Sequence, residues 1–268
     1  MIVMLLRIKV LLIFKTLLIM TKNIVTLLFI VGTLSFTACK QEEMTETNPT
    51  IDIVEPVIKG LIEDVLTMEQ KDALTPELVI KSLMDGNDRF VNNDLTARDH
   101  SMQIRKNTLS QYPKVIVLSC VDSRVPVEDV FDRGIGDLFV TRVAGNFVNE
   151  DILGSMEFAC KVSGSKLGLI MGHEHCGAVK AAINDVKLGN ITSMLEKIKP
   201  AVDVVAHDGE RNSKNQKFVH MVSKSNVKNT IKQIRLNSPI LKEMEDNGEI
   251  MIVGALYDMD NGKVSFIN

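Results

Sequence analysis

The chain has 268 residues, with 31 lysine and arginine residues against 34 aspartate and glutamate residues, a length that suits one or at most two domains. Its formal net charge is −3, and the sequence contains no block of basic residues. This composition argues against nucleic acid as a partner.

An apolar leader is predicted over residues 1–38. It carries four basic residues, no acidic residue and long apolar runs, which is typical of an export signal. The stretch from Met20 has the clearer signal pattern, with Lys22 before an apolar run over 24–36, so Met20 is an alternative start of translation. The remaining 230 residues contain 27 basic and 34 acidic residues, a formal net charge of −7.

The end of this leader resembles the lipobox of bacterial lipoproteins. Thr37 and Ala38 are small residues before Cys39, although Phe36 stands where an aliphatic residue is usual. We expect Cys39 to be lipidated and to anchor an exported protein to a membrane, facing the periplasm or the cell exterior. An uncleaved membrane anchor and an ordinary cleaved signal, which would leave a soluble periplasmic protein, are the alternatives.

A polar tether and linker are predicted over residues 39–74, followed by a folded domain over 75–268. Residues 40–56 contain several glutamates and few large apolar residues, which is typical of a solvated linker.

Short apolar runs rich in branched residues alternate with longer helix-like stretches after residue 75. This alternation predicts an α/β fold with a mostly parallel central sheet flanked by helices. The predicted strands are 115–118, 138–140, 167–171, 250–255 and 264–267. The predicted helices are 76–92, which Thr75 would cap, 149–162, which Asn149 would cap, 176–188, 191–205, 227–235 and 239–247.

Three cysteines remain for the fold if Cys39 is lipidated. Because disulfides use an even number of cysteines, metal ligation becomes a serious alternative for Cys120 and Cys176, with an oxidised pair as the competing interpretation. Cys160 lies beside Phe158 and Ala159 in a predicted helix, and we expect it to be a small buried core residue.

Polar residues follow two of the predicted strands. Cys120, Asp122 and Arg124 come after the first strand, and the run His173-Glu174-His175-Cys176 comes after the third. Because ligands collect at the carboxyl ends of parallel strands, the two loops are expected to converge. Two thiolates and one imidazole suit zinc, and three protein ligands leave one coordination position open, as in catalytic zinc sites.

Asp122 and Arg124 are close enough in sequence to form a charge-assisted pair that keeps Asp122 ionised. The carboxylate could then orient a zinc-bound hydroxide, or it could occupy the fourth coordination position and switch the site off. A zinc hydroxide without evidence of a large substrate cleft suggests attack on a small electrophile.

Together these residues resemble the signatures of the β-class carbonic anhydrases, Cys-x-Asp-x-Arg followed by His-x-x-Cys. The resemblance spans roughly residues 75–268 and includes four further segments in family order, 86–90, 136–146, 200–202 and 253–258. It implies zinc-dependent reversible hydration of carbon dioxide to bicarbonate and a proton, by attack of zinc-bound hydroxide. It selects Cys120, His173 and Cys176 as zinc ligands over His175, with Asp122 joining them only in a closed form.

The resemblance also implies that Asp122 and Arg124 act as the catalytic dyad, and that N-terminal helices pack on a partner subunit in a homodimer or tetramer. Some family members close the site with a bicarbonate pocket. Arg142 and Tyr257 match two of its residues, but Val117 stands where the third, a tryptophan, is found. We therefore favour an open site. For Arg142, the alternative is a purely structural role at the end of a strand.

Other interpretations of the chain are a catalytically silent zinc protein with a structural or sensing role, and a carbon disulfide or carbonyl sulfide hydrolase on the same scaffold. The intact Asp122 and Arg124 count against a silent protein. Glu174 is expected to be a solvated or hydrogen-bonding loop residue, and His100, His207 and His220 are expected at the surface.

Overall fold

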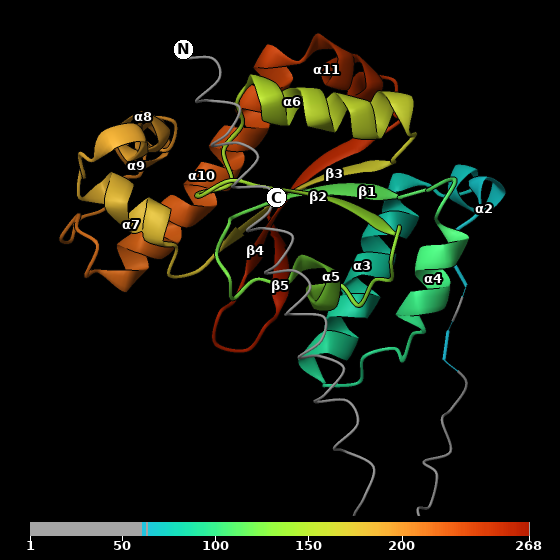
Figure 1. Ribbon diagram of the computed structural model, residues 1–268. Helices are drawn as coiled ribbons and strands as arrows, with labels where there is room; N and C mark the ends of the chain where they lie inside the picture. The colour runs from blue at the N-terminus through green and yellow to red at the C-terminus, as the bar shows by residue number, and fades with distance from the viewer. Residues whose placement is uncertain (1–60, 63, 268) are drawn as a thin grey trace, which may run out of the picture. The chain divides into compact units, whose positions relative to one another are not determined.

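A computed structural model describes residues 61, 62 and 64–267 (Figure 1). The predicted leader, Cys39 and most of the predicted tether lie outside the described residues. Within these residues, none of the helices is long and apolar enough to span a membrane.

A five-stranded sheet forms the centre of the fold. Its strands are β1 (Val115–Ser119), β2 (Leu138–Arg142), β3 (Leu167–His173), β4 (Met251–Tyr257) and β5 (Val264–Ile267), arranged in the order β2-β1-β3-β4-β5. The first four strands are parallel, and β5 is antiparallel to β4. All five predicted strands and the predicted α/β class are thus confirmed.

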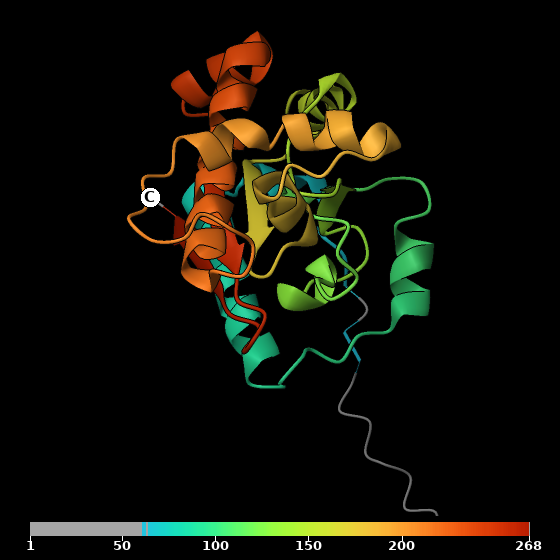
Figure 2. The same cartoon turned by 90° about the vertical axis from the view of Figure 1, so that its left-hand side faces the viewer.

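Helices cover both faces of the sheet (Figures 1 and 2). On one face, α3 (Pro76–Val91) and α5 (Val127–Val130) pack against side chains of β1, β3 and β4 in one hydrophobic cluster. On the other face, a second cluster holds α6 (Glu150–Glu157), the C-terminal half of α10 (Gln216–Asn237) and α11 (Pro239–Asp246). Every residue of β1 and β3 is buried because these inner strands are covered on both sides.

A third cluster lies beside the sheet and contains two of the predicted zinc ligands. It combines Cys120 and Cys176 with the N-terminal half of α10 and the short helices α7 (Gly177–Ile183), α8 (Gly189–Glu196) and α9 (Lys199–Asp203). The sulfur atoms therefore lie in an apolar environment formed by helices that follow them in sequence.

Several predicted helices are confirmed together with their caps. The side chain of Thr75 accepts a hydrogen bond from the Leu78 amide, and Asn149 does the same for Ile152. The helix after Asn149 continues as a π-helical turn, η1 (Phe158–Val162), which contains Cys160. Cys160 is 1% exposed, which confirms it as a core residue, and this burial raises the pKa of its thiol to about 12.

Three helix predictions were wrong in extent. The helix predicted over 176–188 is the shorter helix α7, which ends at Ile183. The single helix predicted over 191–205 is two helices, α8 and α9, and Pro200 lies in the first turn of α9. The helix predicted over 227–235 runs from Gln216 to Asn237. Its inner side contains the buried polar residues Asn226 and Thr230, which interrupt the apolar periodicity that would have revealed its length.

The packed domain begins before residue 75, inside the predicted linker. Ile62 forms a backbone bridge with Arg98, and α2 (Met68–Asp72) buries Lys71, whose ammonium group donates a hydrogen bond to the carbonyl oxygen of Ser163 at 3.1 Å. Three short helices were not predicted, α2, α4 (His100–Lys106) and α5, because each has only one or two turns.

A close approach between α3 and the loop after α5 depends on Gly86. A β-carbon at this position would overlap the carbonyl oxygen of Phe131. The neighbouring residue, Asn87, donates hydrogen bonds to the carbonyl oxygens of Val130 and Gly262 and accepts one from the Val264 amide at 2.8 Å. This side chain therefore connects α3 to β5.

Gly86→Ala is expected to lower the free energy of unfolding by about 1–3 kcal/mol, because the added methyl group separates α3 from this loop. The matched control is Gly154→Ala in α6, where a β-carbon meets nothing within 4 Å. This control should stabilise the protein by up to about 1 kcal/mol, since alanine favours helix. Urea unfolding of both variants provides the measurement, and equal stability of the two would contradict the predicted overlap.

Candidate metal centre

Two loops meet at the carboxyl edge of the sheet. Because β1 and β3 are adjacent and parallel, with Ser119 in register with Met171, the residues that follow the two strands are neighbours. The ligand atoms of Cys120, His173 and Cys176 all lie within 4.8 Å of one another, and all three residues are buried. The two sulfur atoms are 4.0 Å apart and the cysteines are free, so this pair is not a disulfide.

His173 presents an unused nitrogen to the two sulfurs. Its Nδ1 lies 2.8 Å from the carbonyl oxygen of Glu174, which can only accept, so Nδ1 carries the proton and Nε2 has a free lone pair. Nε2 is buried and has no hydrogen-bond partner in the part of the chain that the structure describes. A buried acceptor without a partner is costly, and a cation bound here would satisfy it.

The two thiols are inequivalent. A hydrogen bond from Cys176 lowers the pKa of Cys120, and the Gly145 amide also donates to the Cys120 sulfur at 3.3 Å. The hydrogen bond that the Cys176 thiol donates to Cys120, together with burial, raises the pKa of Cys176. A divalent cation bound by both sulfurs would displace their protons, because the thiolate is the form that ligates a metal. The donor set of two sulfurs and one imidazole nitrogen fits zinc.

Asp122 lies beside these donors and is paired with Arg124. The Arg124 side chain donates to both carboxylate oxygens at 2.9 Å, and its backbone amide donates to Oδ1 at 3.0 Å. The Arg124 guanidinium holds the pKa of Asp122 well below its usual range. Oδ2 of Asp122 is 3.9 Å from Nε2 of His173, yet Asp122 is not part of the group of ligand atoms around the two sulfurs.

Arg142 supports the backbone of the first loop. From the end of β2, its Nε donates to the carbonyl oxygen of Cys120 at 2.7 Å and its Nη2 to that of Asp122 at 2.5 Å. These contacts match the alternative considered for Arg142, a purely structural role at the end of a strand. Two charge-assisted bonds hold the turn that orients both a sulfur donor and a carboxylate.

Tyr257 lies at the end of β4, in register with His173. It is buried in the cluster on the α3 face of the sheet, where Val117 is also found. Strands β2 and β4 are separated by β1 and β3, and Arg142 is level with Ala255, two residues before Tyr257. The backbones of Arg142 and Tyr257 are therefore about 16 Å apart. The structure thus places the two residues predicted for a bicarbonate pocket in different surroundings.

The other histidines near the site have partners elsewhere. His175 has a positive φ of 53° and its Nδ1 lies 3.0 Å from Oε1 of Gln216, so it points toward α10 rather than the sulfurs. Oε1 of Glu174 lies 2.8 Å from Nδ1 of His220, so Glu174 is a hydrogen-bonding loop residue, as predicted. The hydrogen bond from the Gly145 amide to the Cys120 sulfur was not predicted, although Gly145 lies in segment 136–146, which resembles the family.

Removing the Arg142 contacts should weaken metal binding. Arg142→Met keeps the length of the side chain but loses both donors to the loop, and loss of such supporting contacts typically lowers metal affinity by about 10- to 100-fold. Chelator competition measures this affinity. Arg105→Met, which removes an exposed arginine of α4, is the matched control. Equal affinities of the two variants would show that Arg142 does not support the site.

Comparison with known proteins identifies the family. The family model described as carbonic anhydrase matches residues 115–264, more than half of the chain and all of the metal centre. Carbonic anhydrase 2 of Mycobacterium tuberculosis is 34% identical over 194 residues, covering 70% of this chain and 91% of the relative. The carbonic anhydrase of Mycolicibacterium smegmatis is 32% identical over 195 residues, covering 70% and 92%.

Solved structures share the fold at lower identity. The Coccomyxa β-carbonic anhydrase in complex with acetazolamide has a TM-score of 0.56 and 23% identity, covering 70% of this chain and 84% of that one. The β-carbonic anhydrase CafA of Aspergillus fumigatus has a TM-score of 0.54 and 24% identity, covering 63% and 82%. From its sequence similarity, its fold and its Cys-His-Cys centre, this chain belongs to the β-class carbonic anhydrases.

Proposed function

We propose that this carbonic anhydrase catalyses the zinc-dependent reversible hydration of carbon dioxide to bicarbonate and a proton. The observation that carries this proposal is the unpartnered Nε2 of His173 facing two sulfur atoms, with an ionised carboxylate 3.9 Å away. Family membership supports the same reaction.

Cys120, His173 and Cys176 would hold the zinc ion. With three protein ligands, the ion would lower the pKa of a water in its fourth position toward neutrality and so supply a nucleophile for carbon dioxide. The hydrogen bond from His173 to the Glu174 carbonyl fixes the imidazole tautomer and ring orientation that such ligation needs.

Asp122 would orient the attacking water by accepting its hydrogen bond, because its pKa is held low by Arg124 and it stays ionised at neutral pH. The side chain of Asp122 is 16% exposed and that of Arg124 is 57% exposed, so the pair lies between the buried donors and solvent. Both oxygens of Asp122 are engaged by Arg124, which favours the open form. A closed form with Asp122 as the fourth ligand would have to break this pairing.

We propose Arg142 as a positioning residue rather than as part of a bicarbonate pocket, because its guanidinium is occupied by two backbone carbonyls. Its separation from Tyr257 across the sheet supports this assignment. With Val117 in place of tryptophan as well, closure of the site by bicarbonate is not proposed.

A homodimer or tetramer is proposed for the assembly. Strand β2 is an edge of the sheet and its residues are only partly buried, which is unusual for a parallel strand. Exposed apolar side chains near the N-terminal end of the domain add a surface that a second copy could cover, namely Leu78, Met84, Ile104 and Leu109. The related Sordaria macrospora β-carbonic anhydrases, with a TM-score of 0.53 and 19% identity, are described as tetrameric.

We also propose that the protein is exported and anchored to a membrane through a lipid on Cys39, with the catalytic domain facing the periplasm or the cell exterior. The support is the basic and apolar pattern of residues 1–38 and the small residues before Cys39.

Asp122→Asn should lower the turnover of carbon dioxide hydration by about a hundredfold or more, because the amide cannot act as an ionised acceptor. Zinc content should stay at one per chain, since the three ligands are intact. Stopped-flow hydration and metal analysis test both statements, with Asp129→Asn, an exposed residue of α5, as control. Unchanged turnover would refute the role of Asp122.

A wild-type, zinc-loaded protein with no rate above buffer at about pH 8.5 would refute the function itself.

Cys39→Ala should move the protein from the membrane fraction to the soluble fraction, because the lipid attachment point is lost. Fractionation and immunoblotting of the full chain provide the measurement, with Cys160→Ala as the control cysteine. Retention of the Cys39 variant in the membrane fraction would indicate an uncleaved leader instead.

A further inference from the structure

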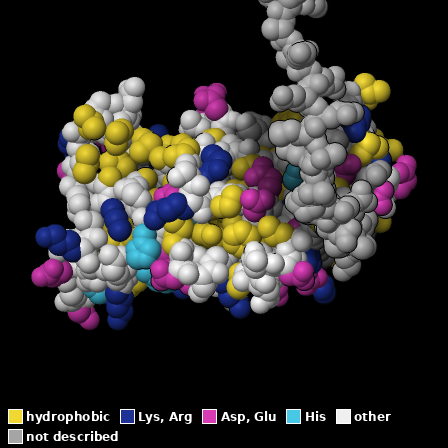
Figure 3. Space-filling model, turned by 60° about the horizontal axis from the view of Figure 1, so that its bottom comes forward, with side chains coloured by type: hydrophobic (Ala, Val, Ile, Leu, Met, Phe, Trp, Pro, Cys, Tyr) yellow, Lys and Arg dark blue, Asp and Glu magenta, His cyan; other side chains and the backbone are white. Residues whose placement is uncertain are grey.

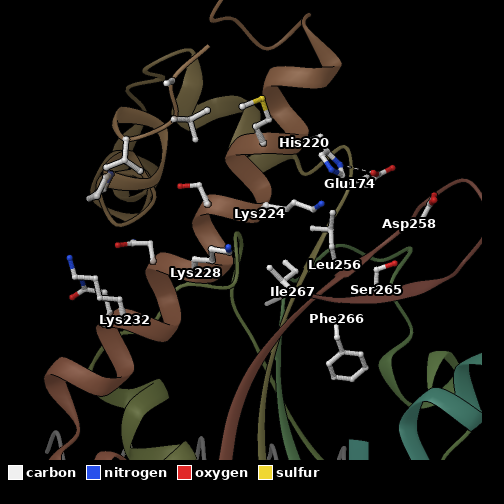
Figure 4. Close-up of a pocket in the computed structure, with 18 residues that line it drawn as sticks. Glu174, His220, Lys224, Lys228, Lys232, Leu256, Asp258, Ser265, Phe266 and Ile267 are labelled. Carbon is white, nitrogen blue, oxygen red and sulfur yellow. Dashed lines mark hydrogen bonds and ion pairs between the residues drawn. The ribbon is translucent and has the colours of Figure 1, made fainter. Parts of the chain in front are cut away.

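A cleft separate from the metal centre lies between α10 and the β4–β5 end of the sheet, with a volume of about 1020 Å³ (Figure 4). Its walls come from α10, from α9 and the chain after it, from the last two strands and from Glu174, which follows His173 in the chain. Neither Cys120, His173 nor Cys176 lines it. The proposed hydration reaction therefore gives this cleft no role.

One wall of the cleft carries a row of lysines. Lys224, Lys228 and Lys232 are each four residues apart on α10, so they lie on one face of the helix at intervals of about 6 Å (Figure 4). All three are exposed, and none makes a hydrogen bond or ion pair with another residue that the structure describes. The cleft also contains two carboxylates, that of Glu174, which pairs with His220, and that of Asp258. Because the three lysines of α10 outnumber them, this wall keeps a net positive charge, which favours an acidic ligand.

Apolar side chains lie next to these lysines. Leu256 and Ile267 contribute from the sheet, and Val204 and Met221 from the helical side. The Phe266 side chain points away from α10 and packs on the α3 face of the sheet (Figure 4). In Figure 3, hydrophobic side chains lie beside Lys, Arg and His side chains on the left-hand part of the surface, the side on which α7–α10 lie in Figure 1. A ligand that fits this cleft would carry apolar groups as well as negative charge.

The third feature is the outer edge of β5, which pairs with β4 alone among the strands that the structure describes. The Asp258 amide donates to the carbonyl oxygen of Lys263, so these two residues form a hydrogen-bonded pair of the antiparallel ladder. Because hydrogen-bonded pairs alternate with pairs that are not, the backbone N–H and C=O groups of Val264 and Phe266 point away from β4. The outward amide of Val264 is bonded to Oδ1 of Asn87. Among the described residues, the Phe266 amide has no such partner, so the edge is open for pairing at Phe266.

We propose that this cleft binds an extended acidic segment of another polypeptide, which adds a strand to the edge of β5 and directs its carboxylates toward Lys224, Lys228 and Lys232. Alternate residues of a strand are about 6.7 Å apart, close to the interval of about 6 Å between the lysines. An extended segment accounts for the open edge, the apolar side chains and the lysine row together, whereas a small anion would use only the lysines.

A fluorescein-labelled hexapeptide of alternating glutamate and valine is the probe, and fluorescence anisotropy with the full chain measures its binding. Replacing Lys224, Lys228 and Lys232 together by glutamine should weaken binding by about tenfold, the combined loss of three partly exposed ion pairs. Lys217→Gln is the matched control, because Lys217 is an exposed lysine of α10 that does not line the cleft. Wild-type binding should also weaken as salt rises.

A second peptide, N-methylated at alternate amides, keeps every carboxylate but cannot pair with a strand edge, and it should bind at least about tenfold more weakly. Equal binding of the two peptides would overturn strand addition, and equal binding by the triple lysine variant would overturn the charge pairing. Displacement by inorganic phosphate at constant ionic strength would show a small-anion site and overturn the proposal. Peptide binding could also be lost at high protein concentration, together with a rise in the sedimentation coefficient that the lysine variant does not show. This result would show that a second copy of the chain occupies the cleft, and it would also overturn the proposal.

Discussion

The parallel pairing of β1 with β3 is the constraint on which the metal centre depends. Cys120 and Cys176 are 56 positions apart in the chain, and their sulfur atoms come within 4.0 Å because both strands end at the same edge of the sheet in a fixed register. Parallel neighbours require a crossover, and here it carries β2 and α6. A shift in this register would separate the donors, so the chemistry of the site follows from the hydrogen-bond ladder of the two inner strands.

Burial and charge then divide the site into an inner and an outer part. The two thiols and His173 lie in an apolar environment where an unpaired polar atom is costly, which favours occupation by a cation. Asp122 and Arg124 lie toward solvent, where a charged pair can be hydrated. Arg142 links the two parts, because it holds the carbonyl oxygens of both Cys120 and Asp122 from the neighbouring strand.

The two edges of the sheet offer different surfaces. Strand β2 is partly buried and is parallel to β1, its one neighbour among the described strands, which suits pairing with a second copy. Strand β5 is antiparallel to β4 and lies beside the lysine row of α10, which suits an acidic segment. The architecture thus separates proposed assembly, catalysis and partner binding into distinct parts of one domain.

The sequence by itself determined the five strands and the capped helices after Thr75 and Asn149, because these follow from local apolar patterns. Short motifs predicted the candidate residues of the metal centre, and the resemblance to the family was needed to choose His173 over His175. The sequence did not determine the extent of α10, whose inner side includes Asn226 and Thr230. Their side chains donate to the carbonyl oxygens of Gly145 and Asn146, contacts that exist only in the folded chain. The hydrogen bonds by which Arg142 holds the first loop, and the cleft beside β5, are likewise formed by residues that are distant in sequence. Only the tertiary structure could decide these features, because a hydrogen-bond partner supplied by another strand leaves no local pattern.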